Sequence, residues 1–165
     1  MFKAAYSLLC IFDSVNSVYG RKKVQKMVHL LETSGTELPF KYEYHFYGPY
    51  SAEVQEEIGF LVQQGFLDEI KHDGAYEYVI TDRGKTFKSM LEEDGGYRIE
   101  IKESLLNSMA DESSQFLEMV STYAFLIDSG YDSLAAREKA LELKPHLERY
   151  ISKAISYYNE KVVNS

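Results

Sequence analysis

Residues 66–80, FLDEIKHDGAYEYVI, carry the clearest local structural signal in the chain. Two runs of alternating apolar and polar residues, 66–71 and 76–80, flank the dipeptide Asp73-Gly74. Asp-Gly between such runs favours the tight turn of a β-hairpin, because the two central residues of that turn need positive φ angles. The stretch therefore predicts two antiparallel strands, and the segments around it determine the fold to which the hairpin belongs.

Helical patterns lie on both sides of this hairpin. Residues 2–18 and 21–34 place apolar side chains at steps of three and four, with Gly20 and Gly35 as breaks. A third helix is predicted from Ser51, which suits an N-cap, to Gly65. A fourth helix follows the hairpin and begins at Thr81 or Asp82.

Residues 44–54, YHFYGPYSAEV, are rich in aromatic rings. Rings and polar residues alternate over residues 40–46, which predicts a short strand, and we expect Gly48-Pro49 to end it because proline cannot donate to a ladder. Two interpretations stay open. The rings of Tyr44, Phe46 and Tyr47 clamp the third helix onto the first two, or they form a surface that binds a partner.

The chain after Gly96 is helical in period, over residues 99–109, 113–127, 133–143 and 145–163. The whole pattern predicts a mainly α protein with a small β-hairpin, of the α+β class. We expect a winged helix-turn-helix domain in residues 1–94, with the hairpin as its wing, and a helical extension in residues 95–165 that serves dimerisation. Tyr150, Tyr157 and Tyr158 favour a homodimer, since tyrosine suits interfaces.

Three segments resemble one known family. GRKKVQKMVHLL (20–31), FKYEYHFYGPYSAEVQEEIGFLVQQGFLDE (40–69) and YEYVITDRG (76–84) are similar, in this order, to the YwgA-like family of small bacterial proteins. The resemblance covers about residues 20–84 and implies a winged-helix-like fold. A fainter likeness, at the Gly48-Pro49 step before a helix, extends to SocA-like antitoxin domains.

The charge balance limits the ways in which this chain can bind nucleic acid. The net charge is −8, and residues 1–94 hold ten Lys/Arg against fifteen Asp/Glu, while the remainder holds eight against eleven. Neither part is basic, which argues against a non-specific DNA-coating protein but not against a site-specific dimer.

A basic stripe is nevertheless predicted at the start of the second helix, where free amides and the helix dipole favour phosphate. We expect Lys22, Lys26 and His29 to lie opposite its apolar face. A solvated helix face explains the same pattern equally well. The candidate DNA-binding residues are Arg21, Lys22, Lys23 and Lys26, joined after the hairpin by Arg83, Lys85 and Lys88.

The third helix is a poor reader of a DNA groove. With its apolar positions turned inward, Glu53, Glu56 and Glu57 face outward, where they would repel phosphates. These carboxylates, together with the aromatic shelf at residues 42–50, indicate a second type of surface. Its candidate protein-binding residues are Tyr44, Tyr47, Tyr50, Glu53, Glu56 and Glu57.

No pattern for catalysis or cofactor binding is present. Cys10 is the single cysteine, in an apolar helical pattern, and is expected to be a buried thiol. The four histidines have no metal-binding spacing, and no phosphate loop or nucleophile motif occurs. We therefore expect a protein without enzymatic activity, cofactor or metal. Since no signal peptide or membrane span is evident, we expect a cytoplasmic location.

Two functions remain. The first is a dimeric winged-helix transcriptional regulator that contacts double-stranded DNA through the basic stripe and the wing. The alternative is a winged-helix-derived protein-interaction module, of the antitoxin, adaptor or DNA-mimic type, that docks through the acidic third helix and the aromatic shelf. We favour the first because bacterial winged helices of this size commonly bind DNA, although the residues of the third helix favour the second.

Overall fold

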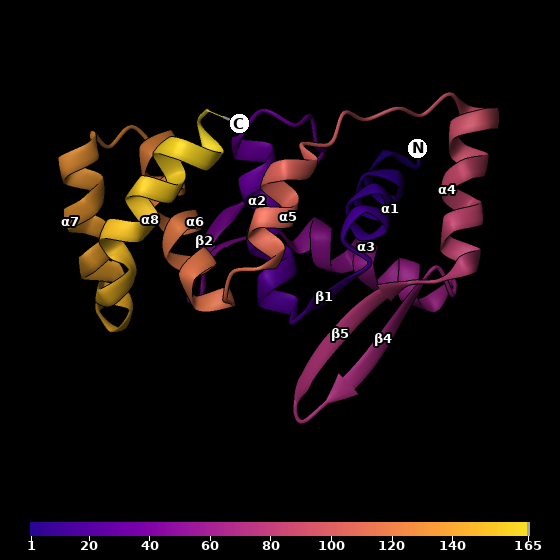
Figure 1. The fold of residues 1–165 in the computed structure, drawn as a ribbon, viewed down its shortest axis with the longest axis horizontal. Coiled ribbons are helices and arrows are strands. Elements are labelled where there is room, and N and C mark those ends of the chain that lie inside the picture. Colours follow the sequence, from indigo (N-terminus) through magenta and orange to yellow (C-terminus); the bar gives the residue numbers. More distant parts are fainter. Residues whose placement is uncertain (165) are drawn as a thin grey trace.

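Helices dominate the computed structural model, which describes residues 1–164 (Figure 1). The first part of the chain folds into α1 (Lys3–Val15), β1 (Ser17–Tyr19), α2 (Arg21–Thr33), β2 (Glu43–His45), β3 (Gly48–Tyr50), α3 (Ala52–Gln63), β4 (Leu67–His72), β5 (Ala75–Ile80) and α4 (Asp82–Gly95). The second part folds into α5 (Glu103–Ala110), α6 (Ser114–Asp128), α7 (Ser133–Leu143), the 3₁₀ segment η1 (Pro145–Tyr150), α8 (Ile151–Tyr157) and the π-helical segment η2 (Tyr158–Val162). The predicted α+β class is confirmed.

The hairpin predicted at residues 66–80 is confirmed as β4 and β5. The two strands pair antiparallel from Leu67 opposite Ile80 to His72 opposite Ala75, and Asp73 and Gly74 take the positive φ angles that the turn requires. The hairpin projects from the helices, as Figure 1 shows. Its inner residue Tyr78 is fully buried, so the base of the hairpin is part of the core.

The first helix is shorter than predicted, because residues 17–19 form a strand. α1 ends at Val15, Asn16 takes a positive φ of 67°, and β1 then pairs with β5, Val18 lying opposite Tyr78. The sheet order is β1-β5-β4. Val18 continues the helical period of the preceding residues, but its burial against the hairpin favours the extended conformation.

The aromatic stretch at residues 40–50 also differs from its prediction. Only Glu43–His45 is a strand, and Gly48-Pro49 does not end the local sheet, because Gly48–Tyr50 forms its second strand. Tyr44 lies opposite Pro49 in this two-stranded hairpin. Proline is tolerated there because an edge position needs no donor on its outer side.

The third helix begins where it was predicted. The Ser51 hydroxyl accepts a hydrogen bond from the Val54 amide, as an N-cap should. The buried side chain of Gln25 in α2 fixes this turn, since its Nε2 donates to the Ser51 carbonyl and its Oε1 accepts from the Ser51 amide, both at 2.9 Å. α3 is thereby anchored to α2.

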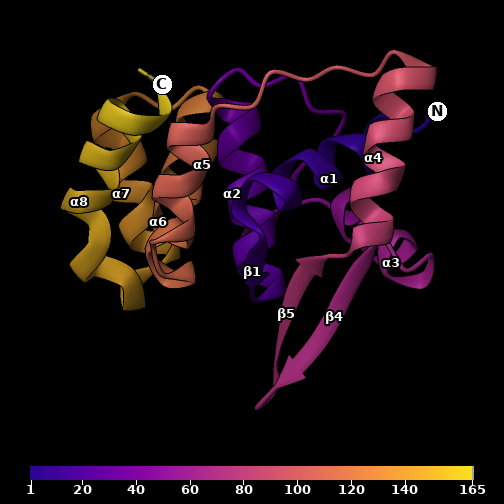
Figure 2. The ribbon, with the colours of Figure 1, turned by 45° about the vertical axis from the view of Figure 1, so that its right-hand side comes forward.

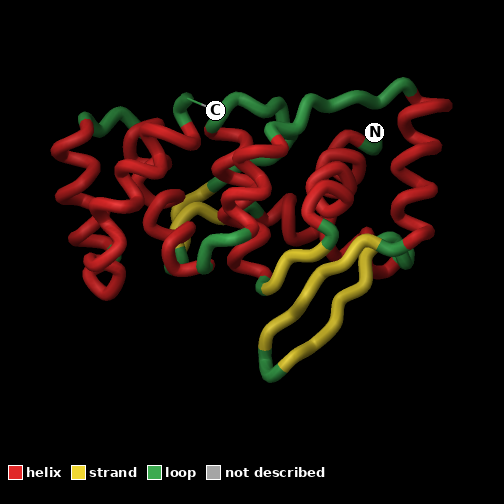
Figure 3. The backbone as a smooth tube through the Cα atoms, in the orientation of Figure 1, coloured by secondary structure: helices red, strands yellow, loops and turns green. Residues whose placement is uncertain are grey.

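The helices after residue 95 pack directly on the first part of the chain. α5 contacts both α1 and α2, α6 contacts α2 and β3, and one hydrophobic cluster extends from α1 to Val162. Figure 2 shows α6, α7 and α8 gathered at the end of the molecule opposite α4. Figure 3 shows the long connections 34–42 and 96–102, which run along the same side. The predicted division after residue 94 falls at the C-terminal end of α4, and the hydrophobic cluster extends across it.

The final helix is regular only in its middle. Residues 145–163, predicted as one helix, divide into the 3₁₀, α and π segments, whereas Ser133–Leu143 is confirmed. Tyr157 and Tyr158, which led to the prediction of a homodimer, are each 8% exposed inside the chain. Both side chains pack inside the protein's own core and are therefore not available to a dimer interface. The homodimer stays a prediction. Cys10 is buried, as expected. Within residues 1–164, no helix combines the length and apolar character needed to cross a bilayer.

Candidate interaction site

A pocket of about 750 Å³ opens between the β2–β3 hairpin and the first turns of α2. We call it the hairpin pocket. Its lining combines cations, amides and rings: Arg21, Lys22, Gln25, Lys26, His45, Phe46, Tyr47, Gly48, Tyr50 and Gln55. A pocket of this size lies within the range that binds small molecules or side chains of a partner.

Two aromatic side chains at the tip of the hairpin point outward. Phe46 is 86% exposed and Tyr47 is 59% exposed. The rings contact each other edge to face at 5.1 Å between centroids, and the Lys22 ammonium lies 5.3 Å from the centre of the Tyr47 ring. The prediction that these rings clamp the third helix is therefore wrong for Phe46 and Tyr47. Tyr44 instead packs against Phe125 of α6.

Lys26 lies beneath the hairpin and is 1% exposed. Its Nζ donates to the Pro49 carbonyl at 2.8 Å. Burial lowers the pKa of Lys26 to about 7, although the nearby Glu118 opposes the shift. The prediction of a solvated face with Lys22, Lys26 and His29 is thus wrong for Lys26, and also for His29, which is 4% exposed. That face of α2 is covered by α6.

A buried carboxylate holds the cations around Lys26 in place. Glu118 of α6 is 2% exposed and pairs with Lys22 and with Lys144, each at 2.9 Å between nitrogen and oxygen. Burial raises the pKa of Glu118, but its contacts with the two lysines more than offset this and hold the pKa below its usual value. Lys144 also donates to the Phe46 carbonyl. Three lysines therefore surround one carboxylate, which leaves the underside of the hairpin positive.

Glu118 and Lys144 were not identified from the sequence. Glu118 shares its helix face with Ser121 and Thr122, a polar pattern that also fits a solvated face, and Lys144 directly precedes a proline. The sequence alone therefore does not show that Glu118 is buried, and it does not identify its partner 26 residues away.

The other predicted DNA contacts at the start of α2 have structural partners. Arg21 donates from Nε to the Tyr78 hydroxyl at 3.0 Å, and its Nη2 lies 3.6 Å from a Glu69 carboxylate oxygen. Lys23 donates to the Ala110 carbonyl at the C-terminal end of α5, where a cation is favoured by the helix dipole. Both side chains connect separate parts of the fold.

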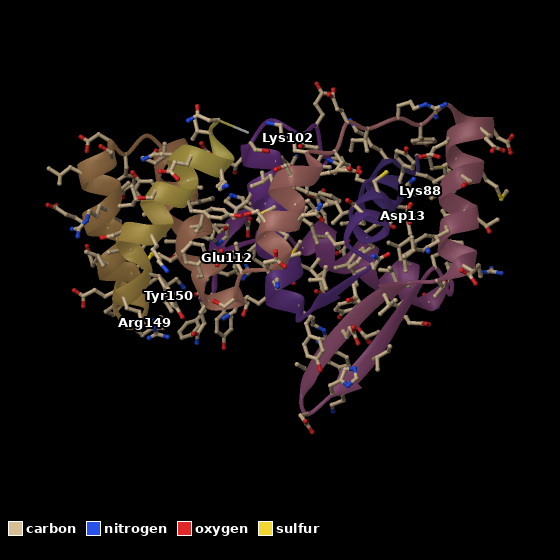
Figure 4. All side chains as sticks on the ribbon, viewed as in Figure 1. Asp13, Lys88, Lys102, Glu112, Arg149 and Tyr150 are labelled. Carbon is tan, nitrogen blue, oxygen red and sulfur yellow. The ribbon has the colours of Figure 1, made fainter. Side chains whose placement is uncertain are left out.

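The cations that follow the hairpin are mostly engaged as well. Arg83 donates to the Gln64 carbonyl, and Lys88 lies 3.4 Å from Asp13 and 3.1 Å from Glu92. Figure 4 shows Lys88 on α4 facing Asp13 on α1. Within residues 1–164, Lys85 is the one member of the predicted set whose side chain forms no hydrogen bond or ion pair. The set is thus distributed over the fold and does not form one free basic stripe.

The carboxylates of the third helix lie largely as expected. Glu53 and Glu56 are exposed, and Glu53 accepts a hydrogen bond from the Lys41 amide at 2.7 Å. Glu57 is half-buried, and burial raises its pKa. Tyr50 is half-buried and packs on His45 with 4.7 Å between ring centres.

The fold and the pocket define a mainly helical α+β protein with a basic, aromatic pocket at its surface. Within residues 1–164, no group of three or more His, Cys, Asp or Glu side chains is placed to hold a metal ion. No family model matches the chain.

The chain is 33% identical over 150 residues to the uncharacterized protein YwgA of Bacillus subtilis (strain 168), which covers 87% of this chain and 86% of that protein. The chain belongs to the YwgA family. The similarity is longer than residues 20–84, so it includes most of the C-terminal helices.

Proposed function

We propose that this protein is a winged-helix-derived module that binds a partner protein through the hairpin pocket and catalyses no reaction. The observation that carries the proposal is the exposure of Phe46 and Tyr47 directly beside the cations of α2. Exposed neighbouring rings are typical anchors of a protein interface, because they bury much apolar area at a small entropic cost.

The charge of the pocket indicates the chemistry of the partner. Lys22, Lys26 and Lys144 lie around the single carboxylate of Glu118, so the pocket attracts an acidic group. We infer a partner segment in which an Asp or Glu is adjacent to an apolar side chain. The apolar side chain would pack on Phe46 and Tyr47, while the carboxylate would approach Lys22.

The order of the elements supports a winged-helix origin. A helix, a strand, a second helix, the α3 helix and the β4–β5 hairpin occur in the order of that fold, with the β2–β3 hairpin inserted between α2 and α3. The resemblance of the Gly48-Pro49 step to SocA-like antitoxin domains favours the same class of function, since an antitoxin acts by binding a protein.

Binding to double-stranded DNA is the competing proposal. It is favoured by Arg83 and Lys85, which are exposed beside the hairpin. Against it, Glu53 and Glu56 occupy the helix that would enter the groove, and the net charge is −8. Carboxylates near phosphates cost several kcal/mol per contact at an effective dielectric constant of about 20.

A displayed-peptide selection on the folded protein tests the proposal. We expect enrichment of peptides that place Asp or Glu next to an aromatic or aliphatic residue. The double variant Phe46→Ser/Tyr47→Ser should lose this binding about a hundredfold, as expected for a pair of anchor residues. The control is Tyr131→Ser/Leu134→Ser, which changes two exposed apolar residues elsewhere and should bind as the wild type does.

A parallel selection of genomic DNA fragments at moderate salt addresses the competing proposal. The selection could enrich a motif whose binding is lost in Arg83→Glu/Lys85→Glu and retained in Phe46→Ser/Tyr47→Ser. This result would contradict the proposal of partner binding and support DNA binding as the function. Enriched peptides that bind both double variants equally would show that the hairpin pocket is not the docking site.

A further inference from the structure

A second cavity, independent of the proposed function, lies where the C-terminal ends of α2 and α6 meet. It has a volume of about 330 Å³ and is lined by His29, Glu32, Thr33, Tyr42, Phe125, Asp128 and Ser129. We call it the helix-end cavity. The sequence gives no sign of it, because its two carboxylates come from helices 96 residues apart.

Several hydrogen-bond acceptors in this cavity have no partner within residues 1–164. Glu32 Oε1 and Tyr42 Oη are buried atoms without a hydrogen bond. The His29 side chain is 4% exposed and its Nδ1 lies 2.6 Å from the Ser121 hydroxyl, while its Nε2 has no hydrogen-bond partner in the described chain. In the tautomer whose Nδ1–H donates to Ser121, Nε2 is an acceptor as well. A buried polar atom without a partner costs about 1–3 kcal/mol, so Glu32 Oε1 and Tyr42 Oη indicate missing partners. The carboxylate oxygen requires a donor, and the hydroxyl oxygen can accept from one.

The surroundings of the cavity are negative. Glu32 and Asp128 lie in the last turns of α2 and α6, where the helix dipoles add negative potential, and neither forms an ion pair within residues 1–164. Glu53 adds to the negative potential at Glu32. Burial raises the pKa of Glu32 to about 7, against a hydrogen bond from the Phe40 amide, and burial also raises the pKa of Asp128.

Two cations of the chain near the cavity form hydrogen bonds outside it. Lys102 donates to the Ser34 carbonyl just beyond α2, and Lys26 donates to the Pro49 carbonyl. The Tyr42 ring packs edge to face on His29 with 4.8 Å between centroids, and the Phe125 ring lies 6.4 Å from the imidazole in a tilted arrangement. The rings therefore provide aromatic walls beside the carboxylates, a combination that favours an organic cation.

We propose that the helix-end cavity binds a cationic nitrogen group, a primary ammonium or a guanidinium. The N–H donors of such a group would satisfy Glu32 Oε1, Tyr42 Oη and His29 Nε2, and its charge would pair with Glu32 and Asp128. The cation belongs either to a free small molecule or to a lysine or arginine side chain of another protein. The chemistry required is the same for both.

An NMR titration of the folded, full-length protein tests this proposal. The probes are n-butylammonium and n-butylguanidinium, with n-butanol as a neutral probe of similar size. We expect the side-chain carboxyl signal of Glu32 and the ring signals of His29 to shift with the cations and not with n-butanol. Glu32→Gln keeps the shape of the side chain and should weaken binding about tenfold, as the loss of one charged hydrogen bond predicts.

The pH dependence provides a second readout. Binding should strengthen as the pH rises from 6 to 8, because Glu32 becomes ionised in this interval. Asp128 also faces the cavity, and burial raises its pKa, so its ionisation acts in the same direction as that of Glu32. Burial lowers the pKa of His29 to about 3 and raises that of Tyr42, so neither of these two titrates in this interval. Lys26, whose pKa is about 7, loses positive charge over the same range and acts in the same direction, so Glu32→Gln is needed to separate the two.

The outcomes are distinguishable. Binding of both free cations, weakened by Glu32→Gln and unchanged by the surface control Glu138→Gln, supports a small-molecule site. Binding of a lysine- or arginine-containing peptide, but not of the free cations, supports recognition of a side chain. Equal shifts with n-butanol, equal shifts with K⁺ or Mg²⁺, or no shift with any cationic probe would overturn the proposal.

Discussion

Lys26 illustrates how one side chain connects the sequence to the site. Its side chain is enclosed by α2, the β2–β3 hairpin and α6, and the single hydrogen bond of its ammonium is to the Pro49 carbonyl. An ammonium in such surroundings loses its hydration, and burial therefore lowers its pKa to about 7. A glycine at position 48 is part of this arrangement, because a Cβ there would lie 3.1 Å from Thr122 Oγ1 and 3.4 Å from Lys26 Nζ.

The substitution Lys26→Met gives a prediction at this scale. The pKa in the folded protein is about 7, below the ordinary value of 10.5, so between these pH values the unfolded chain binds more protons than the native one. The free energy of unfolding of the wild type should therefore rise with pH, relative to the variant, by up to about 1.4 kcal/mol per pH unit. Urea denaturation of both proteins from pH 6 to 10 measures this difference. Parallel curves would mean that Lys26 keeps its ordinary pKa.

The sequence could not have shown that Lys26 is buried. The spacing of Lys22, Lys26 and His29 defines a common face of the helix, and this was predicted correctly. What covers that face is α6, whose Glu118 and Ser121 bond to Lys22 and His29 from more than 90 residues away. Local periodicity does not encode such long-range contacts, and a polar face with buried partners has the same pattern as a solvated one.

At the scale of elements, the sequence predicted helices and strands correctly where their ends are set by nearby turn or cap residues. Asp73-Gly74 defined the β4–β5 hairpin, Ser51 and Thr81 cap α3 and α4, and the α7 helix has the predicted limits. It failed at β1 and β3, which are strands of three residues. Strands this short depend on the partner with which they pair, so their own residues carry too little signal.

The anchoring of α3 supplies a prediction for an element. Gln25 is 3% exposed and bonds to both backbone polar groups of Ser51. In Gln25→Leu the buried Ser51 amide loses its partner, and we expect a loss of about 2–4 kcal/mol in the free energy of unfolding. Chemical denaturation measures it.

The matched control is Gln63→Leu, the same substitution on the exposed face of α3, which should change stability by less than about 0.5 kcal/mol. If both variants lose the same amount of stability, the hydrogen bonds between Gln25 and Ser51 do not anchor the helix.

At the scale of the whole molecule, the shared core connects the two predicted domains. Lys22 pairs with Glu118, His29 bonds to Ser121, and Lys23 bonds to the end of α5, so the polar face of α2 is completed by the C-terminal helices. The apolar cluster also continues from α1 through α6 to Val162. The order of the elements in residues 1–95 follows from the local sequence, whereas the side chains that cover α2 come from helices far along the chain.

A chain that ends at Gly96 tests whether the first part can fold alone. Without α5 and α6, apolar faces of α1 and α2 would be exposed to solvent, and the cations of α2 would lack Glu118. Since a domain is stable by only about 5–15 kcal/mol, we expect residues 1–96 to show no cooperative thermal unfolding, whereas the full chain unfolds in one transition. Circular dichroism and the dispersion of amide NMR signals measure both. A cooperative transition with dispersed signals from residues 1–96 would instead establish an independent domain, in which the C-terminal helices are an addition to a fold that is already complete.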